Sequence, residues 1–387
     1  MSDDQPMSAP AAPPARAVAG ERPALVLRNL RKDFGTVAAV DGIDLEVRRG
    51  EFLTLLGPSG SGKTTTLRMV AGFMAPTSGQ IEIDGSDMTR VPPYRRDVGM
   101  VFQNYALFPH MTAADNVAFP LRMRRRPSSE IKKRVADALE LVKLSSHGDR
   151  YPRQLSGGQQ QRIALARAVV FEPRLLLMDE PLGALDRKLR ESLQLEIIRV
   201  SRELGATVLY VTHDQEEALV MSDRIAIFSM GRIEQLGSGE DLYDRPASLF
   251  VADFIGESNI LRGTYEVDGG SGGWMARDGA RWRVGGATAE RSDLASGAAA
   301  ALVVRPERMR ILDGEASIDG MNTIDATVDE VLYLGPDTKY QLALPSGQRI
   351  SIREPREADA REFQRGDPVR VGWSVDAGLL VSDPGKA

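Results

Sequence analysis

The segment LLGPSGSGKTTTL, from Leu55 to Leu67, places three glycines, a lysine and a run of threonines directly after the apolar, strand-like run EFLTLL. It matches the pattern GxxxxGK[ST], and helix-like sequence follows, which is the order of a phosphate-binding loop. Glycine allows backbone conformations that a Cβ forbids, so several N–H groups can converge on one anion at a helix N-terminus. The alternative is a glycine-rich turn that matches by chance. The sequence favours a nucleoside triphosphate site formed by Gly57, Pro58, Ser59, Gly60, Ser61, Gly62, Lys63, Thr64 and Thr65.

Two acidic residues follow a second strand-like run, in RLLLMDEP, where four apolar residues precede Asp179 and Glu180. Carboxyl ends of parallel strands meet at one edge of a sheet, so these carboxylates are expected beside the phosphate loop. Lys63 would reach the β and γ phosphates, while Thr64 and Asp179 would hold Mg²⁺. Glu180 would polarise the attacking water. An ordinary strand end is the alternative, and the phosphate loop makes it the weaker one.

A second anion site is predicted in QLSGGQQQRIALARA, where Ser156, Gly157 and Gly158 form a helix start. A serine cap followed by small residues leaves backbone N–H groups exposed. A plain helix cap is the alternative. An anion site is favoured over a plain cap because the helix carries an arginine and the chain already has a phosphate loop.

Two further polar residues follow strand-like runs. His213 comes after TVLYV and would touch the γ-phosphate, and Gln103 comes after VGMVF and would reach the metal or the water. A lone histidine is more often structural, and a single glutamine carries little weight alone. Their position at strand ends favours a role at the same edge as Asp179.

The composition limits the class of protein. The chain has 387 residues, 42% of them hydrophobic, a formal net charge of -5 and no cysteine. The negative charge argues against a protein that coats nucleic acid, and the lack of cysteine excludes disulfides and thiolate metal sites. No run approaches the roughly 18 apolar residues that span a bilayer. The first residues are rich in Ala and Pro and lack the apolar core of a secretory signal, so residues 1–22 are expected to be disordered.

The order of apolar, helical and β-type runs along the sequence predicts two folded domains. In 23–237, short apolar runs alternate with helical segments, which is typical of an α/β fold with a mainly parallel sheet. Two early runs, at 24–30 and 43–51, predict a small antiparallel β region. Residues 238–258 are expected to form a helical connector. Residues 259–387 contain brief β-type runs separated by Gly, Asp and Pro, with VDGGSGGW as a loop, which indicates a small barrel or sandwich.

Together these motifs resemble those of the ABC-type ATPases. GPSGSGKT is similar to Walker A, LLLMDE to Walker B, and LSGGQ, from Leu155 to Gln159, to the signature of that family. The resemblance covers about residues 25–237 and implies a P-loop fold with antiparallel and helical subdomains. It adds Gln159 to the nucleotide site, makes Asp186 of GALD the D-loop residue, and makes Phe34 the aromatic residue that stacks on adenine. A core phenylalanine is the alternative for Phe34.

The same resemblance implies how the protein acts. Ser156 of one copy would cap the γ-phosphate held by a second copy, so ATP would join a homodimer and hydrolysis would let it part. FIGESNIL and VRPERMRI resemble the OB-like C-terminal domain of importer ATPases, and PPYRRDVGMVFQNYALFPHMTAADNVAFPL the polyamine (spermidine/putrescine) branch, with iron, phosphonate, sulfate and maltose relatives close. Two membrane permease subunits, a solute-binding protein and a place at the cytoplasmic membrane face are implied. A groove for the permease would be formed by Tyr105, Ala106, Leu107 and Phe108, which could instead pack inside.

Other functions fit less well. A mechanical ATPase acting on DNA or ribosomes usually carries a long coiled coil or two cassettes, and neither is found. A GTPase switch would need an NKxD-type guanine motif, but no Asn is followed by Lys. A small-molecule kinase would leave LSGGQ and the β-rich tail unexplained.

Overall fold

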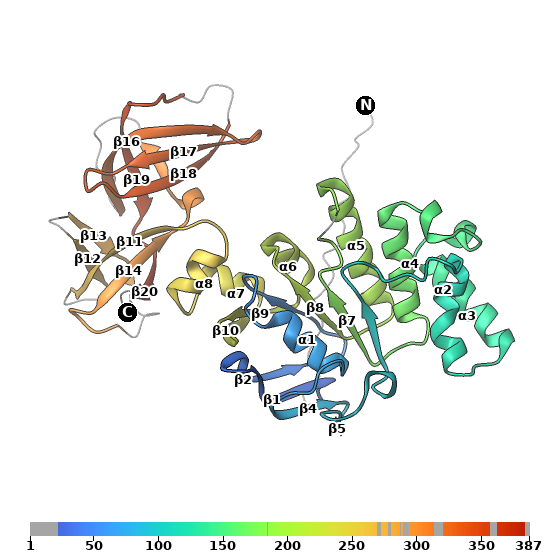
Figure 1. Ribbon diagram of the computed structural model, residues 1–387. Coiled ribbons are helices and arrows are strands. Elements are labelled where there is room, and N and C mark those ends of the chain that lie inside the picture. The colour runs from blue at the N-terminus through green and yellow to red at the C-terminus, as the bar shows by residue number, and fades with distance from the viewer. Residues whose placement is uncertain are drawn as a thin grey trace, which may run out of the picture.

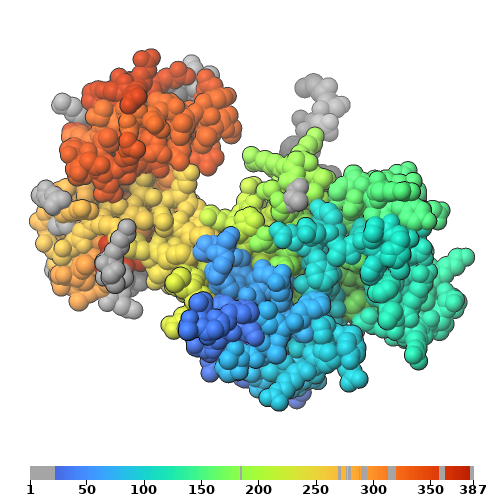
Figure 2. Space-filling view, viewed as in Figure 1, coloured from blue at the N-terminus to red at the C-terminus, as the bar shows by residue number. Residues whose placement is uncertain are grey.

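The computed structural model describes residues 22–183, 185–268, 272–277, 280–286, 288, 294–312, 320–356 and 362–383. The segment expected to be disordered, 1–22, lies outside this range except for its last residue, as does the centre of VDGGSGGW. Figures 1 and 2 show two lobes with the short helices α7 (Gly239–Asp244) and α8 (Leu249–Phe254) between them.

A six-stranded sheet forms the centre of the first lobe. All neighbouring strands are parallel except one antiparallel pair at an edge, between the last two strands in sequence. The predicted, mainly parallel sheet is therefore confirmed. In spatial order the strands are β10 (Arg232–Gly237), β9 (Arg224–Ser229), β3 (Phe52–Leu56), β8 (Val208–Thr212), β7 (Leu175–Asp179) and β6 (Val98–Val101).

Helices cover both faces of this sheet, because successive strand side chains point to opposite sides. In β7, Leu175 and Leu177 pack with α1 (Lys63–Ala71), whereas Leu176 and Met178 pack with the helices of the other face. Three of those helices, α2 to α4, pack against one another as a helical subdomain. The helices of this second face are α2 (Ala113–Met123), α3 (Ser128–Leu141), α4 (Gly157–Val169), α5 (Arg187–Glu203) and α6 (Gln215–Met221).

A four-stranded antiparallel sheet packs beside α1, as expected, in the order β2 (Val37–Val47), β1 (Leu25–Phe34), β4 (Ser78–Ile83) and β5 (Ser86–Asp87). The predicted second strand at 43–51 is wrong at both ends. The observed strand, β2, begins at Val37, directly after a tight turn in which Gly35 has a positive φ of 60°. It ends at Val47 because the chain turns again at Gly50, which has a φ of 69°.

The second lobe contains two antiparallel five-stranded sheets around one apolar core. The β-rich tail is therefore confirmed. One sheet has the order β13 (Ala280–Val284), β12 (Gly273–Arg277), β11 (Asn259–Val267), β14 (Ala299–Val304), β20 (Leu379–Ser382); the other has the order β15 (Arg310–Leu312), β19 (Pro368–Ser374), β16 (Met321–Tyr333), β17 (Asp337–Ala343), β18 (Arg349–Pro355).

One run that the sequence presents as continuous, ALVVRPERMRIL, is divided between these two sheets. Pro306 begins a short 3₁₀ turn between β14 and β15, so the chain leaves one sheet and enters the other. Proline lacks the N–H that a continuing strand would need, which explains the break.

The junction between the lobes is held by a buried arginine, Arg305, which is 1% exposed. Its guanidinium donates hydrogen bonds to the carbonyl oxygens of Tyr243, Ala252 and Ile255, at 2.6 to 2.9 Å. Helices α7 and α8 also pack on β9 and α6 through an apolar cluster. The connector is thus attached to both lobes.

Candidate nucleotide site

The candidate site lies where β3, β6, β7 and β8 end. The register pairs Leu56 with Thr212 and Asp179 with Val211, so these strands finish at one level. The phosphate loop, residues 57–62, leaves the same edge after β3 and leads into α1. We call this the strand-end edge.

The phosphate loop needs glycine at two of its positions. Gly62 has a φ of 106°, and a Cβ there would lie 2.5 Å from the carbonyl oxygen of Ala39. A Cβ on Gly57 would lie 2.3 Å from the carbonyl oxygen of Phe228. A bulkier residue would therefore force the loop away from the strands beside it.

The ammonium group of Lys63 lies inside the phosphate loop. It donates to the carbonyl oxygens of Gly57 and Pro58, at 2.7 and 2.9 Å, and the residue is 5% exposed. Burial lowers the pKa of Lys63, and the nearby carboxylates of Glu180 and Asp179 oppose that shift. A buried cation whose partners are neutral carbonyls is suited to an anionic ligand.

Thr64 and Asp179 meet directly. The Thr64 hydroxyl donates to Asp179 Oδ1 at 3.1 Å, and burial raises the pKa of the Asp179 carboxyl, with that hydrogen bond acting the other way. A hydroxyl beside a carboxylate is an oxygen donor set that suits Mg²⁺. Within the described residues no cluster of three or more His, Cys, Asp or Glu could hold a metal ion by itself. Water and phosphate oxygens would complete the coordination of an ion at this pair.

Glu180 is the centre of a small polar cluster. Its Oε2 accepts a hydrogen bond from Gln103 Nε2 at 3.3 Å and lies 3.3 Å from His213 Nδ1. Its backbone has a φ of 44°, an unfavourable region for a residue with a Cβ. The structure therefore brings together three of the residues predicted to be catalytic, around a strained position of the kind found at functional sites.

The predicted second anion site starts α4. Ser156 Oγ accepts from Gln159 N at 3.3 Å, and Gln159 Oε1 accepts from Ser156 N at 2.9 Å, which is a capping box. Gly158 is buried against Leu189 of α5. The hydrogen bonds described for the side chains of Ser156 and Gln159 join these two residues to each other and Gln159 to His147, and none reaches the phosphate loop.

Phe34 and Asp186 also have defined surroundings. The Phe34 side chain is 50% exposed, with the Lys32 ammonium 5.4 Å from its ring centroid, so it is not a core residue. Asp186 caps α5 by accepting from Leu189 N at 3.0 Å. The ligand roles of both residues stay predictions.

Sequence reasoning missed Arg167, which supports the segment after Gln103. Its guanidinium donates to the carbonyl oxygens of Tyr105 and Ala106, each at 2.7 Å, and burial lowers the pKa of this arginine. Tyr105 and Ala106 both have positive φ, at 57° and 47°. Tyr105, Leu107 and Phe108 are half-buried, whereas Ala106 is exposed. A charged residue inside the apolar run ALARAVV was the available signal.

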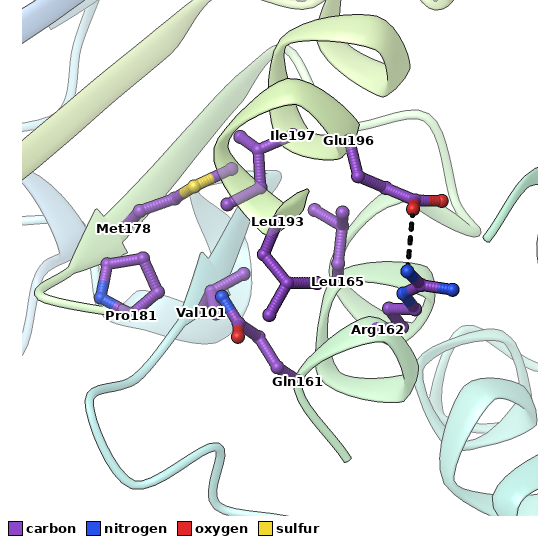
Figure 3. A pocket seen from close by; sticks show the side chains of 9 residues that line it. All are labelled: Val101, Gln161, Arg162, Leu165, Met178, Pro181, Leu193, Glu196 and Ile197. Atoms are coloured by element: carbon purple, nitrogen blue, oxygen red, sulfur yellow. Dashed lines mark ion pairs between the residues drawn. The ribbon is translucent and has the colours of Figure 1, made fainter. Parts of the chain in front are cut away.

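A second missed feature is a cavity of about 10 Å³ beneath α4, shown in Figure 3. Gln161 lines it and is 3% exposed, yet neither its amide nitrogen nor its amide oxygen has a hydrogen-bond partner. The cavity also touches Met178 and Pro181, on either side of the two acids, and α5. An unpaired amide therefore lies between the signature helix and the strand that ends at Asp179.

Fold and site together define a P-loop nucleotide hydrolase. Comparison with known proteins narrows the class, since a family model described as "ABC transporter" matches residues 40–183 and one described as "TOBE domain" matches residues 302–381. The chain is 49% identical over 379 residues to "Spermidine/putrescine import ATP-binding protein PotA" of Thermobifida fusca, covering 96% of this chain and 97% of that one. It is 49% identical to the protein of the same name in Rubrobacter xylanophilus, covering 94% of each chain.

A solved structure supports the fold. "Dimeric structure of a post-hydrolysis state of the ATP-binding cassette MJ0796 bound to ADP and Pi" matches with a TM-score of 0.50 and 35% identity, over 55% of this chain and 98% of that one. The chain belongs to the ATP-binding subunits of ABC transporters and is an ATP hydrolase. The predicted family and fold class are thus confirmed. In the part of the chain that the structure describes, no helix could cross a membrane.

Proposed function

We propose that this protein couples ATP hydrolysis to the import of polyamines such as spermidine and putrescine. The observation that carries the proposal is the 49% identity to import proteins of that name along 96% of the chain, the C-terminal lobe included. Import of another solute, such as iron, phosphonate, sulfate or a sugar, is the alternative, because this subunit need not touch the solute itself.

ATP would bind at the phosphate loop, where the Lys63 ammonium already lies. The backbone N–H groups of the phosphate loop and the Lys63 ammonium would bind the β and γ phosphates. Thr64 and Asp179, with Gln103 nearby, would hold Mg²⁺, which when bound neutralises phosphate charge. Phe34 is exposed and would stack on the adenine ring.

The polar cluster around Glu180 would catalyse hydrolysis. Its carboxylate would take a proton from the attacking water as the water oxygen bonds to the γ-phosphorus. The bond from that phosphorus to the leaving ADP oxygen breaks, which gives ADP and inorganic phosphate. His213 and Gln103 lie 3.3 Å from the same carboxylate oxygen and would orient Glu180 and the γ-phosphate.

Two copies of the chain would share each ATP. The capping box uses the N–H groups of Ser156 and Gln159, so the Ser156 hydroxyl hydrogen and the N–H groups of Gly157 and Gly158, at the start of α4, would bind a nucleotide held by a partner. Asp186 would contact the partner from the start of α5. A related cassette of 35% identity has a dimeric structure bound to ADP and Pi, which supports this arrangement. ATP would favour the closed pair and hydrolysis would release it.

The closing motion would be passed to two membrane permease subunits. Tyr105 to Phe108 follow Gln103, are partly exposed, and have two carbonyls fixed by Arg167, which suits a preformed groove for a short permease helix. The protein would then work at the cytoplasmic face of the membrane, with a solute-binding protein supplying the solute. No nucleic acid partner is proposed.

The test is recovery of partners from native membranes by the tagged Glu180→Gln variant with ATP, against the same variant with ADP. We expect multi-span membrane proteins and a solute-binding protein in the ATP sample, with spermidine or putrescine bound by the latter. A binding protein for another solute would overturn the polyamine proposal. Recovery of only ribosomal or DNA-associated proteins would overturn the transport proposal.

A further inference from the structure

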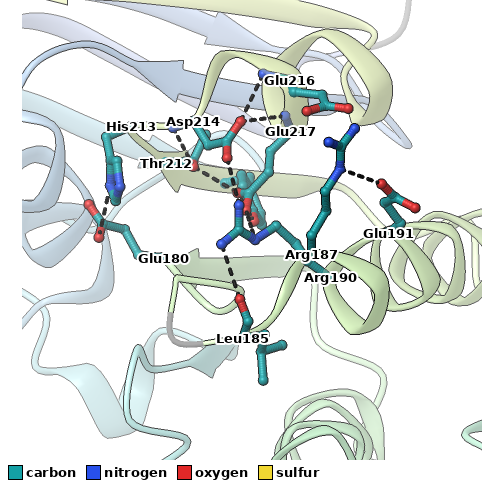
Figure 4. A network of polar contacts seen from close by, with 11 residues as sticks. Glu180, Leu185, Arg187, Arg190, Glu191, Thr212, His213, Asp214, Glu216 and Glu217 are labelled. Atoms are coloured by element: carbon teal, nitrogen blue, oxygen red, sulfur yellow. Dashed lines mark hydrogen bonds and ion pairs between the residues drawn. The ribbon is translucent and has the colours of Figure 1, made fainter. Parts of the chain in front are cut away.

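A single arginine, Arg190 on α5, contacts two loops of the site that are far apart in sequence (Figure 4). One guanidinium nitrogen donates to Asp214 Oδ2 at 3.1 Å, and another donates to the carbonyl oxygen of Leu185, also at 3.1 Å. Leu185 precedes Asp186, and Asp214 follows His213. We infer that Arg190 is a positioning residue for ATP hydrolysis, which fixes the loop of Asp186 relative to the turn of His213.

The turn of His213 is built to receive this arginine. Asp214 Oδ1 caps α6 by accepting from Glu216 N and Glu217 N, at 2.9 and 3.2 Å, which leaves Oδ2 for Arg190. His213 thus lies between Thr212, the last residue of β8, and a carboxylate that is fixed on both of its oxygens. Movement of the guanidinium would be passed to the backbone of His213.

A buried carboxylate supports the same arginine. Glu217 is 2% exposed and accepts from Tyr210 Oη at 2.8 Å and from Thr212 Oγ1 at 2.7 Å. Its other oxygen lies 3.8 Å from Arg190 Nε. The arginine therefore pairs with two carboxylates, and its side chain is only 29% exposed.

The geometry requires arginine and not merely a positive charge. A planar guanidinium can donate in two directions at once, to a carboxylate and to a carbonyl, whereas a lysine ammonium is a single point charge. Arg190→Lys should keep the attraction to Asp214 and Glu217 but lose the hold on the Leu185 carbonyl. This inference rests on the proposed function, in which Asp186 faces the partner copy and His213 faces the γ-phosphate of its own site.

The experiment compares Arg190→Lys with Arg187→Lys. Arg187 lies on the same helix, its side chain is 82% exposed, and its ion pair is with Glu191, one turn away. We expect Arg190→Lys to lower kcat about 10- to 100-fold with little change in KM, as expected when reacting groups are misplaced. ATP-dependent dimerisation, measured by sedimentation in the Glu180→Gln background, should weaken as well. Arg187→Lys should change neither quantity.

Asp214→Asn provides a second variant that approaches the contact from the other side. It keeps an oxygen for the α6 cap and replaces the oxygen that faces Arg190 by an NH₂ group, so it should reproduce the fall in kcat. The double variant should be no slower than the slower single one, because both changes break one interaction.

Three results would overturn the inference. They are an unchanged kcat for Arg190→Lys, equal effects of Arg190→Lys and Arg187→Lys, or a lowered unfolding temperature as the only effect. Failure of the catalytic site proposed above gives a different result, since Glu180→Gln would then retain ATP turnover.

Discussion

Charged residues are buried at the strand-end edge, whereas on the sheets of the C-terminal lobe they form ion pairs near the surface. At the edge, Lys63 and Asp179 are buried. Burial lowers the pKa of Lys63 and raises the pKa of Asp179, so it favours the neutral form of each. In the C-terminal lobe, charged side chains pair across strands near the surface, as Arg353 does with Asp337 at 2.7 Å. The core between its two sheets is apolar and includes the fully buried Trp373.

This difference indicates which residues serve activity and which stabilise the fold. At the edge, the buried charges and the positive φ of Glu180 reduce stability, and the proposed chemistry gives a reason for keeping them there. Exposed ion pairs add little to stability, so the C-terminal lobe must depend on its apolar core. Substitutions at the edge should therefore change chemistry, and substitutions at the junction of the lobes should change stability.

The largest effect is expected from Glu180→Gln. Loss of the carboxylate removes the proton acceptor, so kcat for ATP should fall about 10²- to 10⁴-fold, measured by phosphate release. Nucleotide affinity should remain, and sedimentation with ATP should show dimers. Glu172→Gln is the matched control, because Glu172 also has a positive φ, of 55°, but its carboxylate pairs with Arg134 away from the edge. Equal turnover in the two variants would mean that Glu180 is not the base, and monomers with bound ATP would contradict the shared site.

A second prediction concerns the arginine at the junction. Arg305→Ala removes the guanidinium that donates to the carbonyls of Tyr243, Ala252 and Ile255, and should lower the free energy of unfolding of the C-terminal lobe by about 3 kcal/mol. The three tryptophans of the chain, Trp274, Trp282 and Trp373, all lie in that lobe, so tryptophan emission during denaturation reports on it alone.

Arg308→Ala is the control for the junction. Arg308 pairs with Asp244 at the surface of the same junction, and its loss should cost less than about 1 kcal/mol. Nucleotide affinity should be unchanged in both variants. If Arg305→Ala abolished ATP binding while tryptophan emission stayed the same, the contrast between edge and junction would be wrong.

Sequence and structure agree best where a motif is local. The phosphate loop, the acids after β7 and the start of α4 each combine a strand or helix signal with polar residues within a few positions, so their placement follows from the chain direction of a parallel sheet. Helix and strand boundaries were less predictable. The short α6 has seven residues, which give little periodicity in the sequence, and Pro306 separates β14 from β15 within a single β-type run.

The features that the sequence did not reveal depend on contacts between distant residues. Arg190 is 24 positions from Asp214, and Arg305 is 62 positions from Tyr243. Arg190 belongs to no motif, and Arg305 lies in VRPERMRI, but a local pattern carries no information on which carbonyl a guanidinium will contact. Tertiary packing decides these contacts, as it decides the unpaired amide of Gln161.

A third prediction returns to the edge, with a smaller effect. Lys63→Ala removes a charged donor from the phosphate loop, so ATP affinity should fall about 10- to 100-fold, measured by equilibrium binding. Lys133→Ala, at an exposed position on α3, should leave affinity unchanged. Equal ATP affinity in the two variants would show that Lys63 does not bind the phosphates.

The smallest effect should come from Gln161→Met, where the first lobe buries an amide that has no hydrogen-bond partner. Both amide atoms of Gln161 lack partners beside a small cavity, so an apolar side chain of similar length should raise the free energy of unfolding by about 1 kcal/mol. Gln160→Met is the control, since Gln160 donates to the Leu155 carbonyl at 3.1 Å and should lose stability. A lower unfolding temperature for Gln161→Met would mean that the amide has a partner in solution. If stability rises while ATP turnover falls, the amide gains its partner in the closed dimer. Gln161 would then be a buried polar group that lowers stability and serves activity, as the buried charges at the strand-end edge do.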